Sequence, residues 1–121
     1  MNATVLIADD EPNIVLALEF MLKREGHRVL VARDGAETMQ RIRQENPAVV
    51  LLDATMPGLS GFDICEAVRA DPALAGTRIL MLTAKGRETD KARGLGAGAD
   101  LYITKPFATS ELLDKIREML A

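Results

Sequence analysis

The sequence has few residues suited to disulfide, thiolate or membrane chemistry. It contains one cysteine, Cys65, and one histidine, His27, so an internal disulfide is excluded and the donors for a zinc site are too few. No apolar run approaches the roughly 18 residues that a membrane-spanning helix needs, and the N-terminus lacks the charged start and apolar segment of a signal peptide. We expect a cytoplasmic protein without membrane contact, in which Cys65 and His27 only pack against their neighbours.

The chain also has slightly fewer basic than acidic residues. The chain has 15 Lys and Arg residues against 18 Asp and Glu residues, which gives a formal net charge of −3. Proteins that bind nucleic acid usually present a strongly basic face, so we expect no direct nucleic-acid binding. Hydrophobic residues make up 48% of the 121 residues, which is enough for one buried core. A single domain over residues 1–121 is therefore predicted.

Five short apolar runs that end at polar residues recur along the chain. They lie at Thr4–Asp9, Arg28–Ala32, Ala48–Asp53, Arg78–Thr83 and Asp100–Thr104. Each gap between them is long enough for a helix, a pattern that is typical of βαβ units and a parallel sheet. Because right-handed crossovers place helices on both faces of such a sheet, we predict a doubly wound α/β domain of five βα units.

The gaps also carry signals for where helices begin and which side faces inward. The segment 10–12 offers a cap, first-turn acids and an opening proline to the first helix, while Asp34 precedes the second and Ser60 the third. The expected inward residues are Ile14, Leu18, Met21 and Leu22 in the first helix, Ala36, Met39 and Ile42 in the second, Ile64, Cys65 and Val68 in the third, and Leu112, Leu113, Ile116 and Leu120 in the last.

The fourth gap, residues 84–99, differs from the others. It contains four glycines and almost no inward apolar candidates besides Ala92 and Leu95. Each interior glycine costs a helix about 0.5–1 kcal/mol relative to alanine. We predict a poorly anchored helix that shifts most readily when the charge of a nearby site changes; a plain glycine-rich turn over residues 94–98 is the alternative.

Charged residues stand at the ends of three predicted strands. Asp9 and Asp10 follow the first strand, Asp53 ends the third, and Lys105 follows the fifth. Taken singly, a strand-end aspartate is often a turn former and a strand-end lysine a solvated charge. Parallel strands share a carboxyl edge, however, and open α/β sheets bind their ligands there. Clustered carboxylates repel one another unless a cation joins them, and Mg²⁺ suits such oxygen ligands.

The pattern resembles the receiver domains of response regulators in two-component signalling, from about Thr4 to the C-terminus. The residues that carry the resemblance are Asp9, Asp10, Asp53, Thr83, Lys105 and Pro106, together with the loop at 53–58 and Gly61. The resemblance implies a flavodoxin-like strand order of 2-1-3-4-5. It fits either a stand-alone regulator like those of chemotaxis or a receiver excised from a longer protein.

The resemblance also implies a phosphoacceptor and a metal site. Asp53 is expected to accept a phosphoryl group as an acyl phosphate. Asp10, Asp53 and the backbone carbonyl of Thr55 are expected to bind Mg²⁺ directly and Asp9 mostly through water, with Mn²⁺ able to substitute. Lys105 is expected to pair with the phosphoryl group, and Pro106 to fix the turn through a cis Lys105–Pro106 bond.

The resemblance further implies a conformational switch that responds to phosphorylation. Thr83 is expected to donate to a phosphoryl oxygen, and Tyr102 to fill the space that Thr83 leaves, although a tyrosine that only packs is the alternative. The output surface is expected on the fourth helix, fifth strand and fifth helix, where basic residues could equally form a solvated face. Thr55 and Lys85 flank the site and are expected to tune dephosphorylation, Lys85 by hindering or orienting the attacking water.

The function implied is a phosphorylation-dependent switch rather than an enzyme of ordinary turnover, although it assists its own phosphorylation and hydrolysis. The expected partners are a histidine kinase or phosphotransfer protein and a downstream protein or attached effector domain, with a monomer or a phosphorylation-dependent dimer as the active form. An Asp-nucleophile phosphohydrolase would need a second acid where Thr55 stands. A flavin module would need an aromatic pair that the loops lack, and a scaffold without phosphorylation would not need the full set of acids, threonine and lysine.

Overall fold

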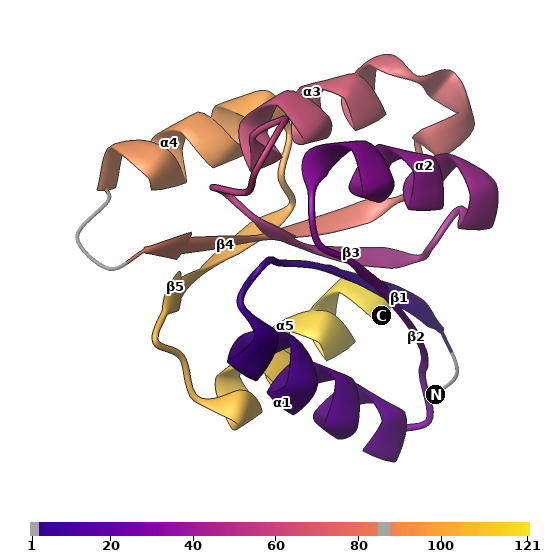
Figure 1. The fold of residues 1–121 in the computed structure, drawn as a ribbon, viewed down its shortest axis with the longest axis vertical. Coiled ribbons are helices and arrows are strands. Elements are labelled where there is room, and N and C mark those ends of the chain that lie inside the picture. The colour runs from indigo at the N-terminus through magenta and orange to yellow at the C-terminus, as the bar shows by residue number, and fades with distance from the viewer. Residues whose placement is uncertain (1–2, 85–87) are drawn as a thin grey trace.

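The computed structural model describes residues 3–84 and 88–121, with side chains described except at 84 and 88–91. Its five parallel strands lie in the order β2-β1-β3-β4-β5, which confirms the predicted topology (Figure 1). The strands are β1 Thr4–Ala8, β2 Arg28–Ala32, β3 Val49–Asp53, β4 Arg78–Ala84 and β5 Leu101–Lys105. The helices are α1 Pro12–Arg24, α2 Gly35–Glu45, α3 Gly61–Ala70, α4 Glu88–Ala97 and α5 Thr109–Leu120, with a short 3₁₀ turn at Pro72–Leu74.

Helices cover both faces of the sheet. Helices α2, α3 and α4 lie on one face and α1 and α5 on the other (Figure 1). Successive strand residues point to opposite faces, so Leu6 and Ala8 belong to the core under α2 and α3, whereas Val5 and Ile7 belong to the core under α1 and α5. All five residues of β3 are buried, as expected for a central strand covered on both sides.

The caps of α2 and α3 match the sequence signals, but that of α1 does not. The Asp34 carboxylate accepts from the Glu37 backbone N–H at 2.8 Å, and the Ser60 hydroxyl accepts from that of Asp63 at 3.2 Å. At the start of α1, Glu11 makes no side-chain cap, and the first turn holds no acid. The cap and the first-turn acids predicted over residues 10–12 are therefore wrong, and the Glu11 side chain pairs with Lys105 instead, whereas the opening proline is confirmed.

The inward faces differ from the prediction at several positions. Val15 and Met119 are buried although the prediction omitted them, while Ala36 is exposed. Thr38 is fully buried because its hydroxyl donates to the Asp34 carbonyl at 2.7 Å, so no polar atom is left unpaired. Cys65 packs in the core, where burial raises the pKa of its thiol to about 11. This environment agrees with a packing role for the cysteine.

Helix α4 contacts the rest of the protein in a way that apolar periodicity does not reveal. Ala92 and Leu95 are exposed, so the predicted inward pair is wrong. Gly94 is buried instead, and a Cβ there would lie 3.4 Å from the side chain of Met81. The Arg93 guanidinium lies 4.3 Å from the centre of the Phe62 ring, which adds a cation–π contact between α4 and α3.

The C-terminal end of α4 is held by Arg69 of α3. The Arg69 guanidinium donates to the carbonyls of Gly98 and Thr77 and to the Asp100 carboxylate, each at 2.7 Å. Asp100 in turn accepts from the Ile79 backbone N–H at 2.7 Å. Charge-assisted bonds of this kind are among the stronger hydrogen bonds in proteins. This end of α4 is therefore tied to both α3 and the sheet.

Replacing each of two glycines at this end of α4 with alanine should change the stability of the protein in opposite directions. Nothing lies within 4 Å of a Cβ at Gly96, so Gly96→Ala should stabilise the protein by about 0.5 kcal/mol through helix propensity. Gly98 has a φ of +109°, and a Cβ there would come within 2.5 Å of Arg69 Cγ, so Gly98→Ala should destabilise it. Urea unfolding of both variants measures these changes, and equal effects would contradict this account of the turn.

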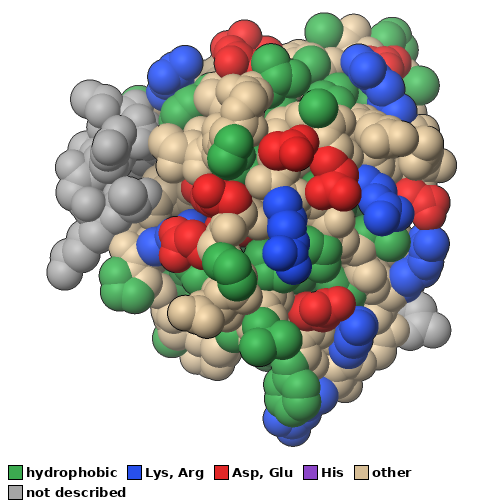
Figure 2. Space-filling model, viewed as in Figure 1, with side chains coloured by type: hydrophobic (Ala, Val, Ile, Leu, Met, Phe, Trp, Pro, Cys, Tyr) green, Lys and Arg blue, Asp and Glu red, His purple; other side chains and the backbone are tan. Residues whose placement is uncertain are grey.

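The charges of the surface are mixed. On the face seen in Figure 2, acidic and basic side chains of the described residues lie interspersed rather than grouped by sign. Within residues 3–84 and 88–121, no helix is long and apolar enough to cross a membrane.

Candidate functional site

Strand register brings the acidic residues to one edge of the sheet. Ala8 pairs with Leu52 in the β1–β3 ladder, so Asp9 and Asp53 come next on neighbouring strands. Asp9, Asp10 and Asp53 each offer a carboxylate oxygen, and these oxygens lie within 4.8 Å of one another. Asp9 and Asp53 are buried whereas Asp10 is exposed. The predicted convergence of the three acids is thus present.

Asp9 is the most enclosed of the three acids. Its side chain is fully buried, and Oδ1 accepts from the Glu11 backbone N–H at 2.9 Å. Oδ2 is also buried and receives no hydrogen bond, but it faces the Lys105 ammonium nitrogen at 2.9 Å. A buried carboxylate oxygen with unused lone pairs next to two further carboxylates is well suited to a cation.

Lys105 reaches this edge from the end of β5. Its Nζ lies 2.9 Å from Asp9 Oδ2, 3.2 Å from Glu11 Oε1 and 3.5 Å from Asp53 Oδ2. Burial by itself would lower the pKa of Lys105, but the close ion pair with Asp9 and the charge of Asp53 outweigh it and raise the pKa. The ammonium group is therefore charged and partly neutralises the acidic cluster.

The electrostatics of Asp53 differ from those of an ordinary aspartate. Burial raises the pKa of Asp53 to about 6, and the charges of Asp9 and Asp10 act in the same direction. The Thr55 backbone N–H, which donates to Oδ1 at 3.1 Å, and the Lys105 ammonium act in the opposite direction. Ionisation of Asp53 is therefore less favourable in the folded protein than in water, and a bound cation would make it more favourable.

This raised pKa predicts a pH-dependent stability. Because the folded protein holds the proton of Asp53 more tightly than the unfolded chain, the stability that this group contributes is lost as the pH rises from about 4 through 6. Asp53→Asn should therefore stabilise the metal-free protein by about 1–3 kcal/mol at pH 8 and much less at pH 4.5. Urea unfolding in EDTA at both pH values measures the difference, and a gain that does not change with pH would contradict the assignment.

The two predicted switch residues lie on neighbouring strands near this edge. Thr83 is buried at the end of β4, and its hydroxyl donates to the Ile103 carbonyl across a long 3.5 Å. Tyr102 of β5 is partly buried and packs against the core under α2 and α3. At 3.5 Å the bond from Thr83 to the Ile103 carbonyl is weak, so the Thr83 hydroxyl can exchange it for another acceptor at little cost.

The remaining predicted residues occupy the loops. Thr55 is exposed two residues after Asp53. The Lys105–Pro106 bond is cis, as the family resemblance implied. Lys85 lies outside the described residues, so its predicted tuning role is not addressed.

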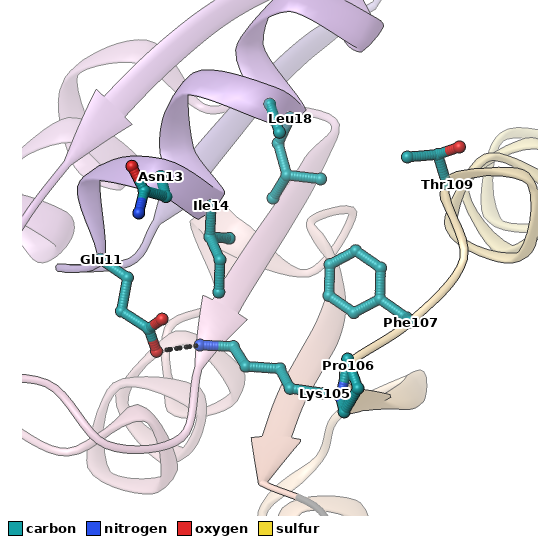
Figure 3. Close-up of a pocket in the computed structure, with 9 residues that line it drawn as sticks. Glu11, Asn13, Ile14, Leu18, Lys105, Pro106, Phe107 and Thr109 are labelled. Carbon is teal, nitrogen blue, oxygen red and sulfur yellow. Dashed lines mark hydrogen bonds and ion pairs between the residues drawn. The ribbon is translucent and has the colours of Figure 1, made fainter.

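Sequence reasoning did not assign a role to Glu11 or to the cleft beside it. A cleft of about 540 Å³ lies between the start of α1 and the turn after β5. Glu11, Ile14 and Leu18 line it on the α1 side, and Lys105 and Phe107 on the other (Figure 3). A third acid directly after Asp10 is the sequence signal that could have indicated a further partner for Lys105.

A sequence model of the response regulator receiver domain matches residues 5–117 of this chain. The chain belongs to the receiver domain family. As a receiver domain of two-component systems it acts in phosphorylation-dependent signalling, and such domains interact with histidine kinases and downstream effectors.

Solved structures of receiver domains share the whole fold. A protein described as a response regulator from Chloroflexus aurantiacus is 36% identical with a TM-score of 0.94, over 99% of this chain and 98% of its own. The chemotaxis response regulator CheY4 of Vibrio cholerae is 31% identical with a TM-score of 0.91, over 98% and 99% of the two chains. The receiver domain of a Pseudomonas aeruginosa sensor histidine kinase, solved with a magnesium ion in its active-site cleft, is 27% identical with a TM-score of 0.90, over 99% and 98%.

Proposed function

We propose that this receiver domain accepts a phosphoryl group on Asp53 in the presence of Mg²⁺ and transmits the change to a partner through its α4, β5 and α5 face. The observation that carries the proposal is the position of Asp53, a buried carboxylate of raised pKa that lies 3.5 Å from Lys105 and beside Asp9 and Asp10. A nucleophile flanked by a cation and by metal-binding acids has the parts that phosphoryl transfer needs.

The donors around Asp53 fit a hard divalent cation. Asp9, Asp10 and Asp53 supply clustered carboxylate oxygens, and the buried Oδ2 of Asp9 receives no hydrogen bond. We assign Asp10, Asp53 and the backbone carbonyl of Thr55 as direct ligands and Asp9 as a ligand mostly through water. Mg²⁺ bound there would neutralise charge on the phosphoryl oxygens, and Mn²⁺ should substitute for it.

The residues of the chain carry the transfer itself. A carboxylate oxygen of Asp53 attacks phosphorus, the bond from phosphorus to the donor breaks, and the donor leaves with the electron pair. Lys105 holds its ammonium beside Asp53 and binds an oxygen of the transferred group, which neutralises part of its charge. In hydrolysis, water attacks the phosphorus of the acyl phosphate and the bond from phosphorus to Asp53 breaks, which frees the carboxylate and inorganic phosphate. We expect Thr55 and Lys85, which stand two positions after Asp53 and Thr83 in the sequence, to tune this step.

The response to phosphorylation begins at Thr83. A phosphoryl group adds about −1.5 to −2 charge and three acceptor oxygens. The Thr83 hydroxyl would exchange its long bond to the Ile103 carbonyl for a bond to a phosphoryl oxygen, and Tyr102 would move into the space that Thr83 leaves. Both changes would alter the α4, β5 and α5 face, where α4 places the small Gly94 against the side chain of Met81.

The proposed partners follow from this role. A histidine kinase or a phosphotransfer protein supplies the phosphoryl group, and a downstream protein or an attached effector domain reads the changed face, with the domain acting as a monomer or as a phosphorylation-dependent dimer. Direct nucleic-acid binding by this domain is not proposed, and we assign it to the cytoplasm. The position two residues after Asp53 is Thr55 rather than an acid, which supports a phosphoacceptor over a phosphohydrolase of ordinary turnover.

Incubation with acetyl phosphate and Mg²⁺, followed by intact-mass analysis, tests the proposal. The wild-type protein should gain the mass of one phosphoryl group, and the gain should disappear with EDTA or in Asp53→Asn. Asp63→Asn, which changes an exposed acid at the start of α3, is the matched control and should behave as wild type. Phosphorylation of Asp53→Asn at the wild-type level would refute the proposed acceptor.

A further inference from the structure

The Lys105 ammonium group forms ion pairs with three carboxylates that differ greatly in exposure. Asp9 is fully buried and Asp53 is 7% exposed, whereas the Glu11 side chain is 57% exposed. The contact with Glu11 at 3.2 Å has hydrogen-bond geometry, whereas Asp9 Oδ2 is paired with Lys105 by charge and receives no hydrogen bond. The 3.5 Å to Asp53 is the longest of the three distances and lies beyond the usual range of a hydrogen bond.

Glu11 is built into the start of α1 in a way that aims it at Lys105. Its backbone N–H donates to Asp9 Oδ1 at 2.9 Å, which ties the residue to the buried acid. Figure 3 shows the Lys105 side chain extending from the end of β5 towards the Glu11 carboxylate, and both residues line the cleft together with Ile14 and Phe107. The Glu11 side chain is thus free to leave while its backbone stays in place.

We propose that Glu11 is a positioning residue that competes with the phosphoryl group on Asp53 for the Lys105 ammonium. This inference rests on the proposed function and assigns to Glu11 the role of keeping the Lys105 ammonium away from Asp53 until the phosphoryl group binds. A phosphoryl oxygen on Asp53 needs the Lys105 ammonium closer to Asp53 than the present 3.5 Å, which draws the ammonium away from its other partners. Opening the ion pair with buried Asp9 would leave an uncompensated charge, whereas the pair with the exposed Glu11 carboxylate is weaker and opens more readily.

The variant Glu11→Gln separates this competition from the shape of the site. It keeps the size of the side chain and the backbone bond to Asp9 but removes the negative charge. We expect its rate of phosphorylation by acetyl phosphate to rise about two- to fivefold, the range that loss of one exposed ion pair allows. Its affinity for beryllofluoride, a phosphoryl mimic, should rise by a similar factor when measured by fluorine NMR with Mg²⁺.

Two controls distinguish competition for Lys105 from a general effect of charge. Glu19→Gln removes a negative charge from α1 at a residue whose carboxylate pairs with Lys23, at 3.1 Å, and not with Lys105. It should leave the rate and the affinity unchanged. In a Lys105→Met background, Glu11→Gln should have no effect on beryllofluoride affinity. If the gain persists without Lys105, Glu11 acts by repelling the anion directly, and the proposed competition is wrong.

The outcomes also separate this inference from the proposed function. If the wild-type protein neither becomes phosphorylated nor binds beryllofluoride, the proposed function itself fails. If the wild-type protein does both and Glu11→Gln matches it or is slower, only the role of Glu11 is overturned. A gain confined to Glu11→Gln and dependent on Lys105 supports the inference.

Discussion

Lys105→Met should lower the rate of phosphorylation of Asp53 by about 10²–10³-fold, the loss typical of removing one preorganised charge at a transition state. The Lys105 ammonium lies within 3.5 Å of the Asp53 carboxylate and is 16% exposed, so water replaces it poorly. Methionine keeps a similar unbranched chain but has no positive charge. The rate with acetyl phosphate and Mg²⁺, followed by intact mass, measures the effect.

Controls separate lost chemistry from lost folding. Lys23→Met removes a positive charge from an exposed site on α1 and should be phosphorylated at the wild-type rate. Urea unfolding establishes that Lys105→Met is folded, and Lys105→Arg, which restores the charge with a different shape, should recover part of the rate. Wild-type phosphorylation of a folded Lys105→Met would show that Lys105 has no part in the transfer.

Gly61→Ala should have the largest effect on stability among simple glycine substitutions near the site, with a loss of about 2–3 kcal/mol. A Cβ at Gly61 would overlap the Asp53 carbonyl oxygen and come within 2.9 Å of Ala54 Cα. These are backbone atoms of the last residue of β3 and of the residue after it, so the methyl group can be accommodated only if the strand end moves. Displacement of Asp53 should also slow its phosphorylation strongly, because transfer depends on precise placement of the nucleophile.

The matched control is Gly76→Ala, at a position where a Cβ would meet nothing within 4 Å. Its stability should stay within about 0.5 kcal/mol of wild type, as for most surface substitutions. Urea unfolding and the phosphorylation rate are measured on both variants. A Gly61→Ala protein as stable and as reactive as Gly76→Ala would contradict the proposed coupling between α3 and the phosphorylation site.

The sheet and its acidic edge were predictable because they depend on local patterns. Strands covered on both faces read as continuous apolar runs, and each predicted strand boundary lies within one residue of the observed one. Once the strands are parallel, Asp9 and Asp53 have to end at the same edge, whatever the details of packing. The family resemblance supplied what these patterns do not contain, namely the strand order and the cis Lys105–Pro106 bond.

The features that escaped prediction depend on tertiary contacts. Gly94 is buried on the inner side of α4, but a glycine carries no hydrophobic signal, so the apolar pattern points to Leu95, which is exposed. Thr38 reads as polar and is buried only because it bonds within its own helix. Glu11 and Lys105 are 94 positions apart in the chain, and their pairing appears only when the two strand ends meet.

The central claim is that the acids at this edge form a phosphorylation site whose acceptor is Asp53. The most direct test is to treat the protein with acetyl phosphate and Mg²⁺, reduce it with borohydride, and map the product by peptide mass spectrometry. Reduction converts an aspartyl phosphate into homoserine, so the account predicts homoserine at position 53 and at no other position. Homoserine at Asp10 or elsewhere, with Asp53 unchanged, would contradict it.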